Sequence, residues 1–335
     1  MLEAMIQLSL FTAKALIIVI VILLLLGGIL GLLGRGKSKS HGKISVKNLN
    51  KYYKEIKQQL LEETLSKKDF KKFIKEEKIK EKKASKEDAS KKNIYIIDFH
   101  GDIKASAVES LREEITAILN IAKQTDEVVL RLESAGGMVH AYGLAAAQLQ
   151  RIRNKDIPLT IIVDKIAASG GYMMAAVANK ILSAPYAIIG SIGVIFQLPN
   201  FHRALKDKHI DFEQVTAGNY KRTLTVFGEN TEEGRAKLHQ EIEEIHQLFK
   251  NLIHDHRQQI DIEKVSTGEH WLAKQAIEYK LVDELITSDD YLLESSKEAN
   301  LYVIHYAIKK SLAEKIFSSA KAFKNNYAAE PYIRI

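Results

Sequence analysis

A chain of 335 residues can hold one large domain or two ordinary ones, and its lack of cysteine excludes disulfide bonds, thiolate zinc sites and a cysteine nucleophile. The net charge of +7 could indicate a nucleic-acid-binding protein. Residues 35–92 alone, however, carry 20 Lys and Arg against 9 Asp and Glu, so the chain from residue 93 onward is mildly acidic. We therefore expect no nucleic acid among its partners.

Residues 15–34 are uncharged and consist mainly of Leu, Ile and Val. A helix of this length, at about 1.5 Å per residue, matches the ~30 Å hydrocarbon core of a bilayer, and a removable signal peptide would have a shorter apolar region. We predict that residues 1–34 are a retained N-terminal transmembrane anchor in contact with membrane lipid. Arg35, Lys37 and Lys39 follow directly and favour a cytoplasmic C-terminal side, but long domains cross membranes with less regard to charge, so the side stays open.

Residues 35–92 form a Lys-rich stretch with interspersed Glu. Its apolar residues recur at roughly helical spacing, which predicts an amphipathic helix over part of it. These residues are Tyr53, Ile56, Leu60, Phe70, Phe73 and Ile74. We interpret the stretch as a solvated helical linker, because runs of like charge are usually solvated; a surface that lies against anionic lipid is the alternative.

From residue 93 onward, apolar strand-like runs alternate with helical patterns. The expected strands cover 94–99, 128–132 and 159–163, and the expected helices cover 106–122, 138–152 and 169–178. This alternation indicates right-handed βαβ units and a largely parallel sheet, hence an α/β fold. Sites in such sheets lie at the carboxyl ends of strands, where the Gly-Gly pairs at 136–137 and 170–171 fall.

The second half of the chain is less regular. Residues 184–195 are apolar and broken by Gly, which suits a core segment or the wall of a hydrophobic groove. We expect a strand at 211–215, a helix at 267–285, a strand at 301–308 and a helix at 311–323. Thr231 begins a long helix whose apolar face is formed by Leu238, Ile242, Ile245, Leu248 and Leu252.

Residues 161–176 read as a buried strand, a tight turn of small residues and a buried helix. Ser169 falls at the first turn of that helix, where free backbone N–H groups and the helix dipole favour a developing negative charge. A serine nucleophile with an amide-lined oxyanion hole needs this geometry. The alternative is that Ser169 only caps the helix.

A serine nucleophile also needs a base. His100, His140 and His202 are candidates, and a triad with Asp164 or Asp102 stays open at this point. A lysine beside an apolar groove is the other choice, because burial favours the neutral amine that accepts a proton. The candidate lysines are Lys165, Lys180 and Lys221. Lys221 follows a predicted strand in a Gly-led loop, where Tyr220 could shield it.

Four motifs in this order resemble the S49 peptidases, the signal peptide peptidase A family, and in particular its SohB-type inner-membrane branch. They are Ser134-Ala135-Gly136-Gly137, Ala168-Ser169-Gly170-Gly171-Tyr172, Gly190-Ser191-Ile192-Gly193-Val194 and Gly218-Asn219-Tyr220-Lys221. The resemblance spans about residues 93–290. It implies a ClpP/crotonase-like fold, proteolysis by a Ser–Lys dyad without cofactor or metal, and a place in the bacterial inner membrane.

Carried over residue by residue, the resemblance makes Ser169 the nucleophile and Lys221 the general base. The backbone N–H groups of Gly137 and Gly170 match the oxyanion hole. Ala135 stands where the family often has Pro, and Arg222 where Ser is common; neither change removes a reacting group. The motifs occur once, so a homo-oligomer is expected, with the dyad shared between neighbouring protomers as in single-domain relatives.

The sequence therefore predicts four parts: an anchor (1–34), a Lys-rich linker (35–92), a catalytic domain (93–290) and a C-terminal extension (291–335). We expect a membrane-anchored serine endopeptidase that cleaves signal-peptide-like or membrane-protein fragments. Two rivals remain open: a crotonase-type acyl-CoA enzyme, which shares the fold, and a catalytically idle membrane scaffold. The first rival needs no Ser–Lys dyad, and the second needs no hydrolytic activity.

Overall fold

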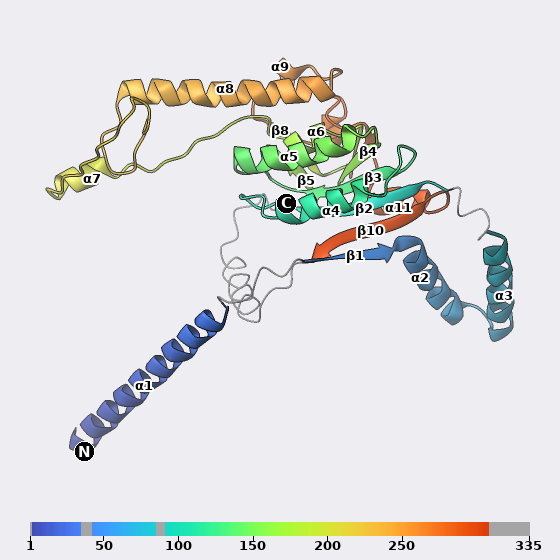
Figure 1. Cartoon of the computed structure of the whole chain (residues 1–335), viewed down its shortest axis with the longest axis horizontal. Coiled ribbons are helices and arrows are strands. Elements are labelled where there is room, and N and C mark those ends of the chain that lie inside the picture. Colours follow the sequence, from blue (N-terminus) through green and yellow to red (C-terminus); the bar gives the residue numbers. More distant parts are fainter. Residues whose placement is uncertain (1, 35–41, 85–90, 308–335) are drawn as a thin grey trace. The chain divides into compact units, whose positions relative to one another are not determined.

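A computed structural model describes residues 2–34, 42–84 and 91–307 (Figure 1). The chain divides into two compact units, Met1–Lys43 with Ala307–Ile335 and Ile44–Tyr306. The first unit contains helix α1 (Leu2–Gly34). Within the three described ranges, no helix satisfies both the length and the apolarity required to cross a membrane. The predicted anchor over residues 1–34 therefore stays a prediction.

A seven-stranded sheet forms the centre of the second unit, in the order β1-β10-β2-β3-β4-β6-β9. From β10 to β9 every neighbouring pair is parallel, as in the register that sets Ile97 of β2 beside Leu130 of β3. The strands are β1 (Lys43–Asn48), β2 (Asn93–His100), β3 (Glu127–Glu133), β4 (Leu159–Val163), β6 (Lys180–Ser183), β9 (Glu284–Leu285) and β10 (Asn300–Ala307). The α/β class with a mostly parallel sheet is confirmed.

Both faces of the sheet are covered, which explains its continuous apolar strands. Every residue of β4, Leu-Thr-Ile-Ile-Val, is buried. Alternate residues of β2 serve two cores: Ile97 and Phe99 pack with α4 (Val108–Leu119) and α5 (Val139–Arg153), whereas Ile94 and Ile96 face the other way. The second core includes Leu49 of α2 (Leu49–Thr64) and Leu292 of α11 (Ser288–Ser295).

A smaller three-stranded sheet lies beside the carboxyl ends of the main strands. It contains β5 (Ile166–Ala168), β7 (Ile188–Gly190) and β8 (His270–Leu272), with β5 and β7 parallel and β8 antiparallel to β7. Helix α6 (Gly170–Ala176) leaves β5 and packs against α5 and against the long α8 (Glu232–His256). The remaining helices are α3 (Lys67–Ala84), α7 (His202–Asp207), α9 (Ile262–Val265) and α10 (Ala273–Ala276).

Several predicted elements are wrong in the second half. Residues 211–215 form no strand and are all exposed. Residues 267–285 are not one helix but β8, the short α10 and β9. Helix α8 begins after Thr231 as expected, but it buries Phe249 and Ile253 and leaves Leu248 67% exposed. The strand predicted at 301–308 is β10, and the helix predicted at 311–323 lies outside the described residues.

Candidate active site

Ser169 occupies a sharp turn between β5 and α6. Its φ of 52° lies in the left-handed region that residues with a side chain rarely adopt, and its ψ is −120°. Backbone hydrogen bonds hold the turn on both sides: the amide of Ser169 donates to Gly190 (2.8 Å), and Met173 donates to the carbonyl of Ser169 (2.9 Å). The side chain of Ser169 makes no capping bond to α6, so the interpretation of Ser169 as a helix cap is wrong.

The Gly-Gly pair after β3 lies directly against this turn. The two segments are tied by backbone bonds from Ser134 to Ile166 (2.9 Å) and from Ala168 to Ser134 (3.0 Å). Gly136 has a φ of 91°, and a Cβ there would lie 2.8 Å from Cβ of Ser169. Only glycine allows the backbone after β3 to approach the serine this closely.

Gly137 and Gly170, whose backbone amides the family resemblance assigns to an oxyanion hole, lie beside Ser169. Gly137 and Gly170 line one cavity together with the serine. Within the described ranges, no acceptor takes a hydrogen bond from the N–H of either glycine. Two free donors next to a serine hydroxyl can stabilise the oxyanion of a tetrahedral intermediate.

The cavity beside Ser169 has a volume of about 70 Å³. Its walls are mainly apolar and come from α5, α6, α8 and the segment after β7. The apolar wall residues are Val139, Met173, Val194, Ile195, Ile245 and Phe249. A cavity of this size and lining suits a small apolar side chain. The sequence indicated the wall formed by residues 184–195, but it gave no sign that the middle of α8 closes the other side.

Lys221 does not line this cavity. It is exposed and lies in the segment between α7 and α8, which Figure 1 shows in yellow beyond the sheet. The expectation that Tyr220 shields it is wrong, because Tyr220 turns to α8: its hydroxyl donates to Glu233 (3.4 Å) and Lys237 lies over its ring. Glu233, the partner of Tyr220, lies about 18 Å along the helix from the cavity residue Ile245. A lysine side chain that starts next to Tyr220 is too short to span this distance.

The alternative bases are engaged elsewhere. Lys165 pairs with Glu133 (3.0 Å) and Lys180 with Glu284 (2.7 Å). Of the described residues, no histidine lines the Ser169 cavity. Asp102 accepts bonds from the amide and the hydroxyl of Ser106 (both 2.8 Å); burial would raise the pKa of Asp102, but these bonds outweigh it and lower the pKa. The structure therefore does not assemble a histidine triad at Ser169.

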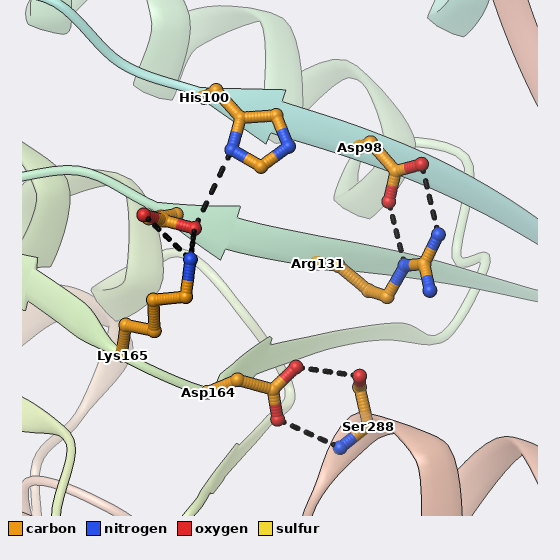
Figure 2. A network of polar contacts seen from close by, with 7 residues as sticks. Asp98, His100, Arg131, Asp164, Lys165 and Ser288 are labelled. Carbon is orange, nitrogen blue, oxygen red and sulfur yellow. Dashed lines mark hydrogen bonds and ion pairs between the residues drawn. The ribbon is translucent and has the colours of Figure 1, made fainter.

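A second, polar pocket of about 340 Å³ lies at the ends of β2, β3 and β4, on the face of the sheet that carries α11. Strand alternation puts its side chains there, because they follow the residues of the α11-side core at even spacing. Figure 2 shows three sets of partners: Asp98 with Arg131, Glu133 with His100 and Lys165, and Asp164 with Ser288. Asp164 thus accepts hydrogen bonds from the amide and the hydroxyl of Ser288, the first residue of α11. Asp98 pairs with Arg131, and Glu133 pairs with Lys165, inside the same pocket.

Two models of one peptidase family together match most of the chain. Residues 3–149 match the model of the peptidase family S49 N-terminal region, and residues 151–302 match the model of peptidase family S49. The chain belongs to peptidase family S49. This S49 peptidase is 49% identical to "Probable protease SohB" of Haemophilus influenzae, over 93% of this chain and 92% of that one.

A second relative, "Probable protease SohB" of Buchnera aphidicola subsp. Schlechtendalia chinensis, is 46% identical over 87% of this chain and 97% of its own length. Among solved structures, a serine-to-alanine mutant of the "1510-N membrane-bound stomatin-specific protease" aligns with a TM-score of 0.41 and 17% identity, over 61% of this chain and 84% of that one. The family and the two SohB relatives support a peptidase.

Proposed function

We propose that this S49 peptidase is a serine endopeptidase in which Ser169 is the nucleophile and Lys221 the general base. The observation that carries the proposal is the convergence of the strained Ser169 turn and the free amides of Gly137 and Gly170 on one apolar cavity. An acyl-CoA enzyme with a related oxyanion hole has no need of a serine at this position.

The reaction follows from these groups. The neutral amine of Lys221 takes the hydroxyl proton of Ser169 as the serine oxygen attacks the peptide carbonyl carbon. The amides of Gly137 and Gly170 hold the oxyanion, and the lysine ammonium returns the proton to the leaving amine as the C–N bond breaks. Water then attacks the acyl-enzyme as Lys221 takes its proton, and the lysine ammonium returns that proton to the oxygen of Ser169 when the ester bond breaks and the carboxylic acid leaves.

Lys221 would come from a second copy of the chain. Two features support this arrangement: the separation of Lys221 from Ser169 within one subunit, and the exposed apolar side chains on the segment that carries Lys221. Val215 is 97% exposed, and Ile210, Phe212 and Phe227 are exposed as well. Apolar surface of this extent on a projecting segment is typical of a protein–protein interface. The active enzyme would then be a homo-oligomer.

We also propose that residues 1–34 anchor the enzyme in the bacterial inner membrane. The uncharged apolar run at 15–34 supports the proposal. An anchored enzyme with a small apolar cavity would meet signal-peptide-like segments and membrane-protein fragments at the bilayer surface. The side of the membrane is decided by protease accessibility of the second unit in sealed vesicles.

A serine-reactive phosphonate tests the proposal on the full-length protein in detergent. We expect one labelled residue, Ser169, and Ser169→Ala should lose the label together with about 10⁴-fold or more of the peptidase activity. Ser191→Ala is the matched control, because Ser191 also has a φ of 52° and lies in the neighbouring turn after β7. Labelling of another serine, or an active Ser169→Ala enzyme, would refute the assignment and favour one of the rival functions.

A further inference from the structure

The hydroxyl of Tyr142, on α5, belongs to a chain of hydrogen bonds that starts at the loop carrying Gly137 and passes through the buried hydroxyl of Ser134. The amide of Gly136 donates to Oγ of Ser134 (3.1 Å), Ser134 Oγ lies 2.6 Å from Oη of Tyr142, and Tyr142 donates to the carbonyl of Asp102 (2.8 Å). Neither side chain has a role in the reaction described above.

The donors and acceptors of these three hydrogen bonds can be assigned in only one way. The Asp102 carbonyl cannot donate, so it takes the single hydroxyl proton of Tyr142. Ser134 must then donate its own proton to Tyr142, which leaves a Ser134 lone pair for the Gly136 amide. The N–H of the Ala135–Gly136 peptide, which directly precedes the peptide carrying the Gly137 amide, is thereby held toward Ser134. The Gly137 amide is left free at the cavity.

Burial of the two hydroxyl groups makes these hydrogen bonds costly to break. Tyr142 is 0% exposed and Ser134 is 1% exposed, so neither hydroxyl can replace a lost partner with bulk water. Burial also raises the pKa of Tyr142, with the nearby Asp102 adding to the rise and the Ser134 bond opposing it. The phenol therefore stays protonated at neutral pH, as this set of hydrogen bonds requires.

The ring of the same tyrosine borders the second oxyanion donor. A Cβ on Gly170 would collide with the ring and would lie 2.8 Å from Cβ of Tyr142. Tyr142 also lines the Ser169 cavity. One side chain thus contacts both parts of the site: its hydroxyl bonds to Ser134, which accepts the Gly136 amide, and its ring packs against Gly170.

We propose that Tyr142 is a positioning residue that sets the geometry of the oxyanion hole through Ser134. The inference rests on the proposed function, since it assigns a task to the amides of Gly137 and Gly170. These amides act mainly on the transition state, so a displaced Gly137 amide lowers kcat more than it changes KM.

The test is steady-state kinetics of the full-length enzyme with Tyr142→Phe. Loss of an entire oxyanion donor costs about 10²–10³ in kcat. A misplaced donor should cost less, so we expect a fall in kcat of roughly 10-fold with KM within about twofold. Ser134→Ala breaks the chain one bond earlier while leaving Tyr142 bonded to Asp102. It should give a similar fall, and the double variant should be no worse than either single one.

Tyr172→Phe is the matched control. Tyr172 lies on α6, is 0% exposed and donates one bond to a backbone carbonyl, that of Leu281 (3.0 Å), away from the oxyanion loop. It should lower Tm about as much as Tyr142→Phe but leave kcat unchanged. Equal losses of kcat in the two variants, or a Tyr142→Phe effect confined to KM, would overturn the inference. Phosphonate labelling separates the two claims, because an unlabelled wild type refutes the proposed function instead.

Discussion

Ser169 holds a backbone conformation that costs about 1–3 kcal/mol for a residue with a side chain. Such strain persists only where the surroundings impose it, and here the bonds to Gly190 and Met173 do so. The turn exposes the hydroxyl to the cavity that contains the free amides of Gly137 and Gly170. The remaining requirement at the residue scale is a base, and the described residues that line the cavity provide neither a lysine nor a histidine.

Replacement of Lys221 tests the base directly. Lys221→Arg should be inactive, with Tm unchanged, because guanidinium keeps its proton in the working range whereas the amine can lose it. His140→Ala and His202→Ala are the controls and should remain active. An active Lys221→Arg enzyme together with an inactive histidine variant would replace the dyad with a triad.

At the scale of elements, the strands that could be predicted from the sequence are those with long, continuous apolar runs. The run at 159–163 is β4 residue for residue, and the strands near 94–99 and 128–132 are β2 and β3. The three-residue strands β5 and β7 were missed, because such short strands are defined by their partners and show no period of their own. The predicted strand at 211–215 has no neighbouring strand in the described subunit, and an alternating pattern alone does not make a strand.

Only part of the candidate site could be predicted from the sequence. Ser169 and the two glycine pairs could be found because tight turns restrict the residue types locally. Tyr142 could not be found, because its role depends on Ser134 and on the carbonyl of Asp102, forty residues away in sequence. The contribution of Phe249 and Ile245 to the cavity likewise required the position of α8, which a stripe of apolar residues predicts only to within a residue or two.

One element-scale contact makes stability depend on pH. Glu114 on α4 is 3% exposed and accepts the amide of Tyr306 on β10 (2.8 Å). Burial raises the pKa of Glu114 above its ordinary value of 4.5, although the Tyr306 bond and the nearby His305 oppose the rise. The folded protein thus holds this proton to higher pH than the unfolded chain. Its stabilising effect is present below pH 4.5 and is lost as pH rises through the raised pKa.

Glu114→Gln removes this dependence while keeping an acceptor for Tyr306. We expect its Tm relative to wild type to be more favourable at about pH 7 than at about pH 4, by roughly 2–4 °C. Glu113→Gln, at the exposed neighbouring position of α4, should show no such change between the two pH values. A Tm difference between Glu114→Gln and wild type that is the same at both pH values would contradict the argument.

At the scale of the whole molecule, the proposal that Lys221 is the base for Ser169 implies a second copy of the chain, because the two residues are separated within one chain. The described subunit places the serine and its amides beside α6 and the lysine loop beside the first turns of α8. Exposed apolar residues on the segment between β7 and α8 provide a surface for such an assembly. If the proposal is right, the free subunit contains a nucleophile without its base, and assembly is what makes the peptidase active.

Mixing inactive subunits tests this central claim most directly. Ser169→Ala and Lys221→Ala chains with different affinity tags are expressed together, and the mixed oligomers are isolated through both tags. Each variant alone should be inactive. The mixed oligomers should recover between roughly a half of the wild-type rate per subunit, for a dimer, and about a quarter, for a large ring, because a site is complete when an intact Ser169 meets the intact Lys221 of a neighbour. Mixed oligomers that form and remain inactive would contradict the account.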